Sequence, residues 1–396
     1  MSNRRAAIKI IDKLQRHGFQ ALLAGGCVRD MLLGRPAKDY DVATDARPED
    51  VIRLFGRTLK VGAKFGVVIV LMQSEQIEVA TFRSEAGYED GRHPTEVRFT
   101  SAAEDASRRD FTINGMFFDP LREQVIDYVG GQADLARRLL RTIGAPQERF
   151  GEDYLRMLRA VRFSTQLGFA IDSETYAAIR ENAVNITRIS GERIALELEG
   201  ILVDPNRAAG TALLIETGLA PAIFPGFAGV GAERAVAVLG HLRKRVGFPL
   251  ALAAFFAGFA TDFVQQGVEI LKLSRKQVRH LEFLLAQRGR LLDVEMSLAE
   301  LKRLLAEPYF WDLYELERAM QKAAGAKKEL AALGRLRRRI RDLGDIDIKP
   351  KPLLNGHDLI HLGAVPGPAL GQLAEELYTA QLEGQLRTTD QAKWWA

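Results

Sequence analysis

The sequence predicts an α+β fold: a mixed β-sheet flanked by helices in the N-terminal part, followed by helices alone. Hydrophobic residues at helical spacing predict an amphipathic helix over residues 4–16. Short β-type runs, bounded by glycine or proline, follow at 21–24, 40–43, 67–72 and 77–82. From Pro146 onward the hydrophobic spacing is helical, and we expect no further strand.

The composition is that of an ordinary globular protein. Of 396 residues, 47% are hydrophobic and 27% are charged, and at roughly 100–200 residues per domain this length predicts two to four domains. A single cysteine, Cys27, excludes an internal disulfide and a cysteine-rich zinc site, and suits a reducing compartment. The longest hydrophobic stretch, 246–260, is shorter than the roughly 20 residues of a membrane span, so we expect a buried helix there. These features predict a cytoplasmic protein without a membrane segment, and they do not indicate an oligomeric state.

A Gly-Gly turn is the first candidate for a binding site. Gly25 and Gly26 follow the hydrophobic run at 21–24, and glycines let the backbone turn sharply and approach a ligand closely. Backbone N–H groups at the start of a following helix could hold phosphate oxygens, with Arg29 adding positive charge. Gly-Gly turns are also common where no phosphate binds, so this feature alone does not decide the function.

Three carboxylates strengthen the prediction of phosphate chemistry. Asp39 and Asp41 are two residues apart, and on a strand such residues point to the same face, so we expect their carboxylates to converge. Like charges that close are costly unless a cation lies between them, and Mg²⁺ is typically held by a few carboxylates together with substrate phosphates. Glu78 adds a third acid between Ile77 and Val79, although a solvent-exposed edge strand would also accommodate it. Together the acids predict a two-metal phosphoryl-transfer site with Asp39, Asp41 and Glu78 as catalytic residues and Mg²⁺ at Asp39 and Asp41.

Four ordered motifs resemble a known enzyme family. Residues 25–44, which contain the Gly-Gly turn and both aspartates, are similar to the signature of class II tRNA nucleotidyltransferases and bacterial poly(A) polymerases, in the polymerase-β-like nucleotidyltransferase superfamily. Three further segments match in the same order: 108–114 (RRDFTIN), 127–135 (DYVGG, then DL) and 152–163 (EDYLRMLRAVRF). The resemblance covers roughly the first half of the chain. In the second half it is limited to helical character and to 356–360.

The resemblance implies a domain order and an activity. The expected domains are a nucleotidyltransferase catalytic head at 1–145, a helical neck with a nucleotide-selecting helix at 146–205, a helical body at 206–330 and a tRNA-binding helical tail at 331–396. The implied activity is addition of C and A nucleotides, from CTP and ATP, to the 3′ end of tRNA without a template. Its cofactor would be Mg²⁺.

The segment 152–163 suggests how a base could be chosen. Polar residues recur there every three positions and would form one stripe of a helix: Asp153, Arg156, Arg159 and Arg162. A solvated stripe is the alternative interpretation. Cytosine and adenine share an amino donor beside a ring-nitrogen acceptor, so Asp153 can accept from the first and Arg156 can donate to the second. Uracil and guanine would leave both groups unpaired, at about 1–3 kcal/mol each.

The resemblance completes the expected nucleotide site. It places Arg159 and Arg162 nearer the triphosphate, and it implies that Arg109 contacts the nucleotide beside Asp110. The full nucleotide-binding set is therefore Gly25, Gly26, Arg29, Arg109, Asp110, Asp153, Arg156, Arg159 and Arg162.

The motifs leave the product open, because CCA-adding, A-adding, CC-adding and poly(A)-adding members share them. The segment 83–98 corresponds to a flexible segment that helps the family switch from C to A, which argues against a CC-only enzyme. The long basic C-terminal extension usual in the poly(A) polymerases is not found. CCA addition is the leading interpretation; the alternatives are A addition beside a separate CC-adding enzyme, and poly(A) synthesis. Outside this class remain nucleotide transfer to a small molecule and non-catalytic RNA binding.

A basic cluster in the second half is the candidate RNA contact. The net charge is +4, and basic side chains gather between 322 and 351 with few acids among them. A solvated helix face is the alternative interpretation. We expect RNA phosphates to contact Arg335, Arg337, Arg338, Arg339 and Arg341.

Overall fold

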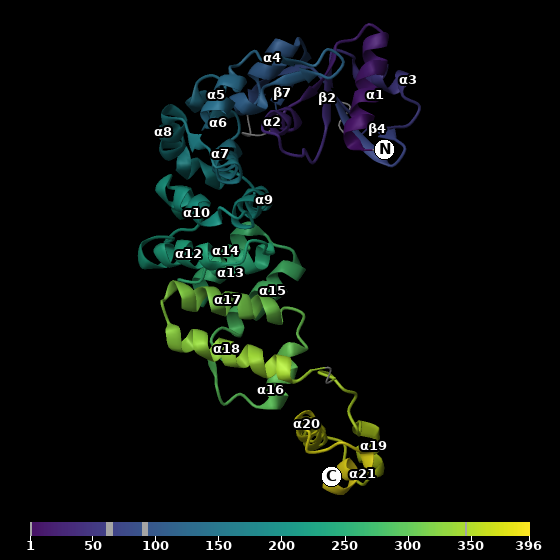
Figure 1. Ribbon diagram of the computed structural model, residues 1–396, viewed down its shortest axis with the longest axis vertical. Helices are drawn as coiled ribbons and strands as arrows, with labels where there is room; N and C mark the ends of the chain where they lie inside the picture. Colours follow the sequence, from purple (N-terminus) through teal and green to yellow (C-terminus); the bar gives the residue numbers. More distant parts are fainter. Residues whose placement is uncertain (1, 61–65, 89–93, 345–346) are drawn as a thin grey trace. The chain divides into compact units, whose positions relative to one another are not determined.

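The N-terminal part of the chain is built on one mixed β-sheet (Figure 1). The computed structural model describes residues 2–60, 66–88, 94–344 and 347–396, and in these ranges seven strands pair in the order β3-β4-β5-β2-β1-β8-β9. The strands are β1 (Ala21–Ala24), β2 (Asp41–Thr44), β3 (Thr58–Leu59), β4 (Val67–Met72), β5 (Glu75–Thr81), β8 (Phe117–Asp119) and β9 (Gln124–Ile126). Neighbouring strands are antiparallel except β2 and β5, which run parallel.

Helices and a hydrophobic cluster hold this sheet. Helix α1 (Asn3–Arg16) packs against β1, β2 and β5 through a buried stripe at helical spacing, which includes Ile10, Ile11 and Leu14. On one face of the sheet, residues of β1 and β2 join α4 (Ala102–Ser107) in a cluster centred on Phe82 and Phe117. The two rings meet edge to face with centroids 5.7 Å apart. Ala43 of β2 belongs to this cluster, so Asp41, two residues earlier on the same strand, stands on the same face of the sheet.

The structure confirms the predicted fold class and most of the predicted elements. The observed bounds of β1 and β4 agree with the predictions, and α1 begins one residue earlier than predicted. Strand β2 begins at Asp41, one residue later than predicted, and β5 begins at Glu75. The expectation of no strand beyond Pro146 is wrong in one place: β11 (Ala170–Ile171) pairs in parallel with β10 (Leu139–Leu140). A two-residue strand is too short to show a period of two.

The segment 83–98, expected to be flexible, contains two strands. Strands β6 (Arg83–Tyr88) and β7 (Pro94–Phe99) pair antiparallel with each other, apart from the large sheet. Residues 89–93 of this segment lie outside the described residues.

Contacts divide the chain into two compact units: residues 1–228 with 270–272, and residues 229–269 with 273–396. The remaining helices of the first unit are α2 (Gly26–Leu32), α3 (Pro48–Leu54), η2 (Thr112–Asn114), α5 (Gly131–Arg137), α6 (Pro146–Glu152), α7 (Leu155–Leu167), α8 (Ser173–Asn182), η3 (Ala183–Arg188), α9 (Gly191–Leu202), α10 (Arg207–Glu216) and α11 (Leu219–Ile223). This two-way division does not test the four predicted domains, which stay a prediction.

In the first unit, α7 is fixed by close packing against α9 and α10. Gly210 makes this approach possible, because a Cβ atom at that position would lie 2.4 Å from the Thr165 hydroxyl. Helix α7 therefore has little freedom to slide, which matters because it carries several of the predicted nucleotide-binding residues.

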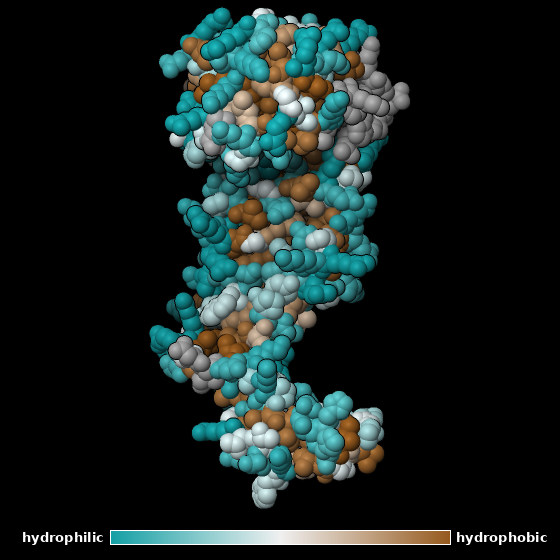
Figure 2. Space-filling model, turned by 90° about the vertical axis from the view of Figure 1, so that its right-hand side faces the viewer, coloured by the Kyte–Doolittle hydropathy of each residue, from teal (hydrophilic) through white to brown (hydrophobic). Residues whose placement is uncertain are grey.

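The second unit is helical in its described residues. Its helices are α12 (Gly229–His241), α13 (Phe248–Phe255), most of α14 (Thr261–Leu271), α15 (Arg275–Ala286), η4 (Arg290–Leu292), α16 (Leu298–Leu305), α17 (Phe310–Ala323), α18 (Lys327–Asp342), α19 (Gly356–His361), α20 (Pro368–Leu382) and α21 (Thr389–Trp395). Every residue of α13 except Pro249 is buried, which confirms the buried helix predicted within 246–260. None of the described helices is both long and hydrophobic enough to cross a bilayer. On the face shown in Figure 2, hydrophobic residues lie in patches among hydrophilic ones.

Candidate active site

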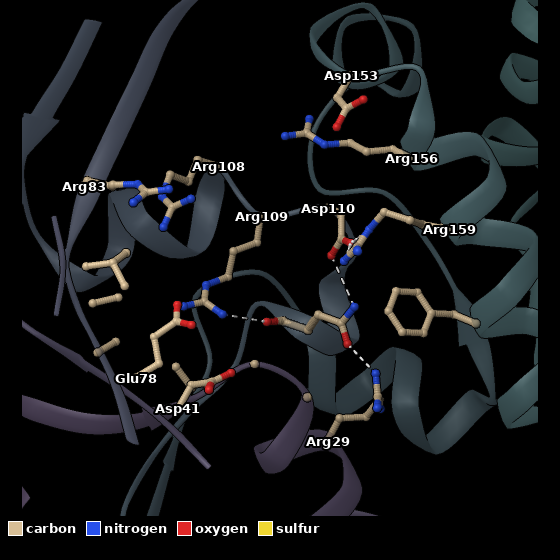
Figure 3. Close-up of a pocket in the computed structure, with 18 of the residues that line it drawn as sticks. Arg29, Asp41, Glu78, Arg83, Arg108, Arg109, Asp110, Asp153, Arg156 and Arg159 are labelled. Atoms are coloured by element: carbon tan, nitrogen blue, oxygen red, sulfur yellow. Dashed lines mark hydrogen bonds and ion pairs between the residues drawn. The ribbon is translucent and has the colours of Figure 1, made fainter. Parts of the chain in front are cut away.

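Two carboxylates stand side by side on neighbouring strands. In the parallel pair β2–β5, Val42 lies opposite Val79, so Asp41 and Glu78, one residue earlier on each strand, share one face of the sheet. Figure 3 shows both side chains pointing into the same pocket, beside the Arg109 guanidinium. Sheet pairing therefore brings together two acids that are far apart in sequence.

The electrostatics of this pair favour a bound cation. Asp41 keeps contact with solvent, yet partial burial raises its pKa to about 6, with further increases from the charges of Glu78 and Asp39 and an opposing effect of Arg109. A raised pKa means that the ionised carboxylate is not fully compensated by its surroundings. Oxygen donors with excess negative charge suit a hard divalent cation.

Asp39 is placed differently from the expectation. It lies exposed in the loop before β2, so the argument that residues i and i+2 of a strand share a face does not apply to it. Its charge still reaches Asp41, as the pKa of Asp41 shows. Within the described ranges, no three His, Cys, Asp or Glu side chains come together as a ready-made metal site. Two converged carboxylates nevertheless fit Mg²⁺, which is commonly bound by one or two carboxylates plus substrate phosphates.

One cavity of about 480 Å³ gathers most of the predicted site. The predicted residues that line it are Gly25, Gly26, Arg29, Asp41, Glu78, Arg109, Asp110, Asp153, Arg156 and Arg159. Asp39 and Arg162 do not line it. The Arg162 guanidinium pairs instead with Glu197 of α9 at 2.6 Å.

The Gly-Gly turn lies directly against an arginine of this cavity. Gly25 has a φ of 74°, a left-handed conformation, and a Cβ atom there would lie 2.9 Å from Nη1 of Arg109. Glycine is therefore needed twice over, for the backbone conformation and for the space that the guanidinium occupies.

Asp110 anchors helix α7 to the sheet-bearing part of the first unit. Its Oδ2 accepts two hydrogen bonds from Arg159, at 2.9 Å from Nε and 2.6 Å from Nη2. Burial by itself would raise the pKa of Asp110, but the charge and hydrogen bonds of Arg159 hold it below its ordinary value. Asp110 is therefore a fixed anion, and Arg159, expected near the triphosphate, is held by it.

Asp153 is not part of the helix on which it was predicted. Helix α6 ends at Glu152, Asp153 has an extended backbone, and α7 begins at Leu155. The Asp153 side chain accepts a hydrogen bond from the Leu155 N–H at 3.0 Å, as a carboxylate near a helix N-terminus commonly does. The predicted continuous stripe is therefore wrong at its first member, although Asp153 and Arg156 still lie together at the pocket (Figure 3).

The predicted RNA-binding arginines lie on α18, in the second unit. Arg335, Arg337 and Arg338 are exposed. Arg339 is half-buried and donates to the Met296 carbonyl at 2.6 Å, whereas Arg341 lies beside Asp342. The structure thus leaves part of the cluster at the surface and commits Arg339 to a backbone contact.

Comparisons with known proteins agree with this geometry. Residues 21–141 match the family described as the poly A polymerase head domain, and residues 168–229 match a probable RNA- and SrmB-binding site of polymerase A. A CCA-adding enzyme of Lacticaseibacillus paracasei is 37% identical over 388 residues, which is 96% of this chain and 93% of that relative. The chain belongs to the family of CCA-adding enzymes.

A solved structure, that of the Bacillus stearothermophilus CCA-adding enzyme in complex with CTP, matches this family member over 100% of its length and 97% of the other chain. The TM-score is 0.84 and the sequence identity is 32%. A Geobacillus kaustophilus CCA-adding enzyme is 49% identical over 223 residues, 56% of this chain. That alignment spans only about half of the relative, 55% of its length. The family resemblance and the fold class are confirmed.

Several pocket residues of this family member were missed by the sequence analysis. Arg193 of α9 donates to Asp153 at 2.7 Å, and the pair is 40 residues apart, so no local pattern could reveal it. Asn114 was noted only as part of a motif. Asp105 does not line the pocket but binds two arginines that do, and it could have been found, because it precedes Arg108 and Arg109 by three and four residues, the spacing of ion pairs near a helix end. Further missed residues of the pocket lining are Arg83, Arg108, Leu155 and Phe163.

The buried carboxylate of Asp105 orients two pocket arginines. It is 2% exposed, and it accepts from Arg108 at 2.7 Å and from Arg109 at 3.0 Å. Burial would raise the pKa of Asp105, but Arg109 and Arg108 lower it below its ordinary value. A depressed pKa stabilises the folded state above the unfolded pKa of about 3.9, and this contribution is lost as the pH falls through the folded pKa.

We therefore predict that Asp105→Asn lowers the free energy of unfolding at pH 7 by on the order of 3 kcal/mol. In urea unfolding at lower pH, the difference from the wild type should begin to shrink near the unfolded pKa of about 3.9 and should vanish only below the depressed folded pKa, where Asp105 is protonated in both states. Asp12→Asn is the control, because the Asp12–Arg16 pair is exposed and should contribute less than about 1 kcal/mol. Equal losses in the two variants would contradict the prediction.

Proposed function

We propose that this chain adds CCA to the 3′ end of tRNA, using CTP and ATP and no nucleic-acid template. One observation carries the proposal: the acid pair Asp41–Glu78 and the pair Asp153–Arg156 line the same cavity. A nucleotide bound there would meet phosphoryl-transfer groups at one end and base-reading groups at the other. The relatives named CCA-adding enzyme, and the solved one in complex with CTP, support the choice of nucleotide and product.

Divalent cations support the chemistry in nucleotidyltransferases of this family. We propose Mg²⁺, held by Asp41 with Asp39 as the second ligand and with Glu78 beside them. When bound, Mg²⁺ neutralises phosphate charge and lowers the pKa of the attacking hydroxyl. Strand pairing holds Asp41 and Glu78 in fixed positions on one wall of the pocket. The 3′-hydroxyl and the α-phosphate would therefore meet at a defined place.

Base selection is proposed to rest on unused hydrogen-bonding capacity. Asp153 accepts from the Leu155 N–H and from Arg193, which leaves further lone pairs of its carboxylate for an amino group of C or A. Arg156 uses Nη1 for the Arg149 carbonyl at 2.9 Å and for Glu152. Its remaining N–H groups can meet a ring nitrogen. Because both side chains are held by protein groups, a mismatched base could not recruit them by rotation.

Arginines on the other side of the pocket are proposed to receive the triphosphate. Arg83, Arg108 and Arg109 surround the end of the pocket near Glu78 in Figure 3, and Arg29 follows the Gly-Gly turn. The guanidinium plane matches phosphate oxygens in pairs. Arg162 would join them only by leaving Glu197, so its phosphate contact remains the least supported member of the predicted set.

The decisive experiment offers three tRNA transcripts, ending before CCA, after C and after CC, with Mg²⁺ and with single or mixed nucleotides. We expect full CCA on the shortest transcript, and no addition of U or G. A alone added to the CC-ending tRNA would instead indicate an A-adding enzyme that needs a partner. Long A tracts on unrelated RNA would indicate a poly(A) polymerase. Failure to extend any RNA would overturn the proposal, and labelling of a small hydroxylated molecule in its place would support the alternative transferase.

We predict that Asp41→Ala abolishes extension, by a factor of 10³ or more, because removal of a metal-holding carboxylate removes charge stabilisation worth several kcal/mol. Binding of tRNA should remain near the wild-type level in a filter-binding assay. Asp45→Ala is the matched control, since Asp45 follows the same strand but does not line the cavity. EDTA should stop extension by the wild type, and added Mg²⁺ should restore it. Full extension by Asp41→Ala would contradict the assignment.

We also propose that tRNA is held by the tail segment 331–396, through exposed arginines of α18. Reversal of Arg335, Arg337 and Arg338 to Glu should weaken tRNA binding and reduce its salt dependence, because each lost phosphate contact lowers the slope of log K against log salt by about 0.7–0.9. The matched control is reversal of Arg16, an exposed arginine of the first unit. An unchanged affinity and slope in the triple variant would remove α18 from the RNA contact. A tRNA substrate also leads us to propose a cytoplasmic location.

A further inference from the structure

A single buried amide joins the two ends of the pocket. Asn114 lies in η2 and is 7% exposed. Its Oδ1 accepts a hydrogen bond from Nη1 of Arg29 at 2.7 Å, and its Nδ2 donates to Oδ1 of Asp110 at 3.2 Å. Its backbone carbonyl accepts from Nη1 of Arg109 at 3.3 Å. The dashed lines at Arg29, Asp110 and Arg109 in Figure 3 mark these three contacts.

The partners determine the chemical identity that this position requires. Arg29 can only donate and the Asp110 carboxylate can only accept, so the connecting side chain must offer one acceptor and one donor in fixed positions. The planar amide of Asn does so. A hydrophobic side chain would leave a buried guanidinium N–H of Arg29 unpaired, and it would remove one of the two hydrogen bonds that Oδ1 of Asp110 accepts, the other coming from the Phe111 N–H. An Asp would place a second negative charge where Nδ2 now lies, 3.2 Å from the Asp110 carboxylate.

The two partners belong to different parts of the proposed nucleotide site. Arg29 lies in α2, directly after the Gly-Gly turn, on the side proposed for the triphosphate. Asp110 holds Arg159 of α7, one turn beyond Arg156, on the side proposed for the base. Asn114 therefore lies between the triphosphate end and the base end. Its side chain, in η2, connects Arg29 to Asp110 through two hydrogen bonds.

We propose that Asn114 is a positioning residue, which fixes the separation between the phosphate-binding and base-binding ends of the pocket. The proposal rests on the proposed nucleotidyl-transfer function and deepens it. Asn114 need not touch the nucleotide. It acts through Arg29 and Asp110, so that one bound nucleotide finds the groups at both ends in the correct places only when the amide is present.

The test compares two ligands that occupy different parts of the pocket. ATP spans both ends, whereas tripolyphosphate occupies only the phosphate end. Dissociation constants for each are measured by calorimetry, with Mg²⁺ and without RNA, for the wild type, Asn114→Asp and Asn114→Ala. We expect the ratio of ATP affinity to tripolyphosphate affinity to fall about ten- to a hundredfold in both variants. The new negative charge in Asn114→Asp weakens the binding of both ligands alike. The affinity ratio therefore reports the lost alignment between the phosphate-binding and base-binding ends.

The matched control is Thr112→Val, in the same short helix. The Thr112 hydroxyl is buried and donates to Asp134 at 2.8 Å, outside the cavity lining. This substitution should lower thermal stability as the Asn114 variants do, but leave the affinity ratio at the wild-type value. A wild-type ratio in both Asn114 variants, or an equal fall in Thr112→Val, would overturn the inference. Because binding is measured without RNA, failure of the wild type to extend tRNA would count against the proposed function and not against this inference.

Discussion

The arrangement of this pocket depends on one constraint: charges gathered in a half-enclosed cavity must each be held by an opposite charge or by a fixed dipole. Asp41 and Glu78 are held side by side by strand pairing, and the raised pKa of Asp41 shows that protein groups do not fully compensate the charge of Asp41. At Asp105 and Asp110 the charge is compensated, because arginines keep the pKa of these buried carboxylates below the ordinary value. The carboxylates in and behind the cavity are therefore of two kinds: the charge of Asp41 is not fully compensated, whereas the charges of Asp105 and Asp110 are. That difference distinguishes the place for a cation from the carboxylates that serve as scaffolding.

The scaffolding carboxylates explain how helix α7 is held against the sheet-bearing part of the first unit. Asp110 is contributed by the loop before η2, and it binds Arg159 of α7 through two nitrogen atoms. Breaking such a buried pair is costly, because the partner left behind is an uncompensated charge. Glu197 of α9 plays a comparable part for Arg162, beside the close packing of α7 on α9. The end of the pocket proposed to read the base is thus fixed by ion pairs that lie behind it.

The sequence predicted well what depends on local pattern. The hydrophobic runs of β1 and β4 gave the correct bounds, and the Gly-Gly turn and Asp41, singled out from the sequence, line one cavity in the structure. It failed for β8 and β10, because strands of two or three residues show no periodicity. It also failed for contacts such as Arg193 with Asp153 and Arg29 with Asn114, which join residues 40 and 85 positions apart. Such pairs are set by the packing of the fold, and a single sequence carries no sign of them.

Asp153 shows why the error about the helix stripe matters for mechanism. Had it lain within a helix, its carboxylate would have been one member of a flexible surface row. Placed instead before the first turn of α7, it is tied through one oxygen to a backbone N–H of that helix and through the other to Arg193. A carboxylate held at both oxygens cannot turn to suit a different base, and its remaining lone pairs point in directions set by the backbone. Selection between bases without a template needs this rigidity, since discrimination comes from the cost of leaving buried polar groups unpaired and vanishes if those groups can move to find other partners.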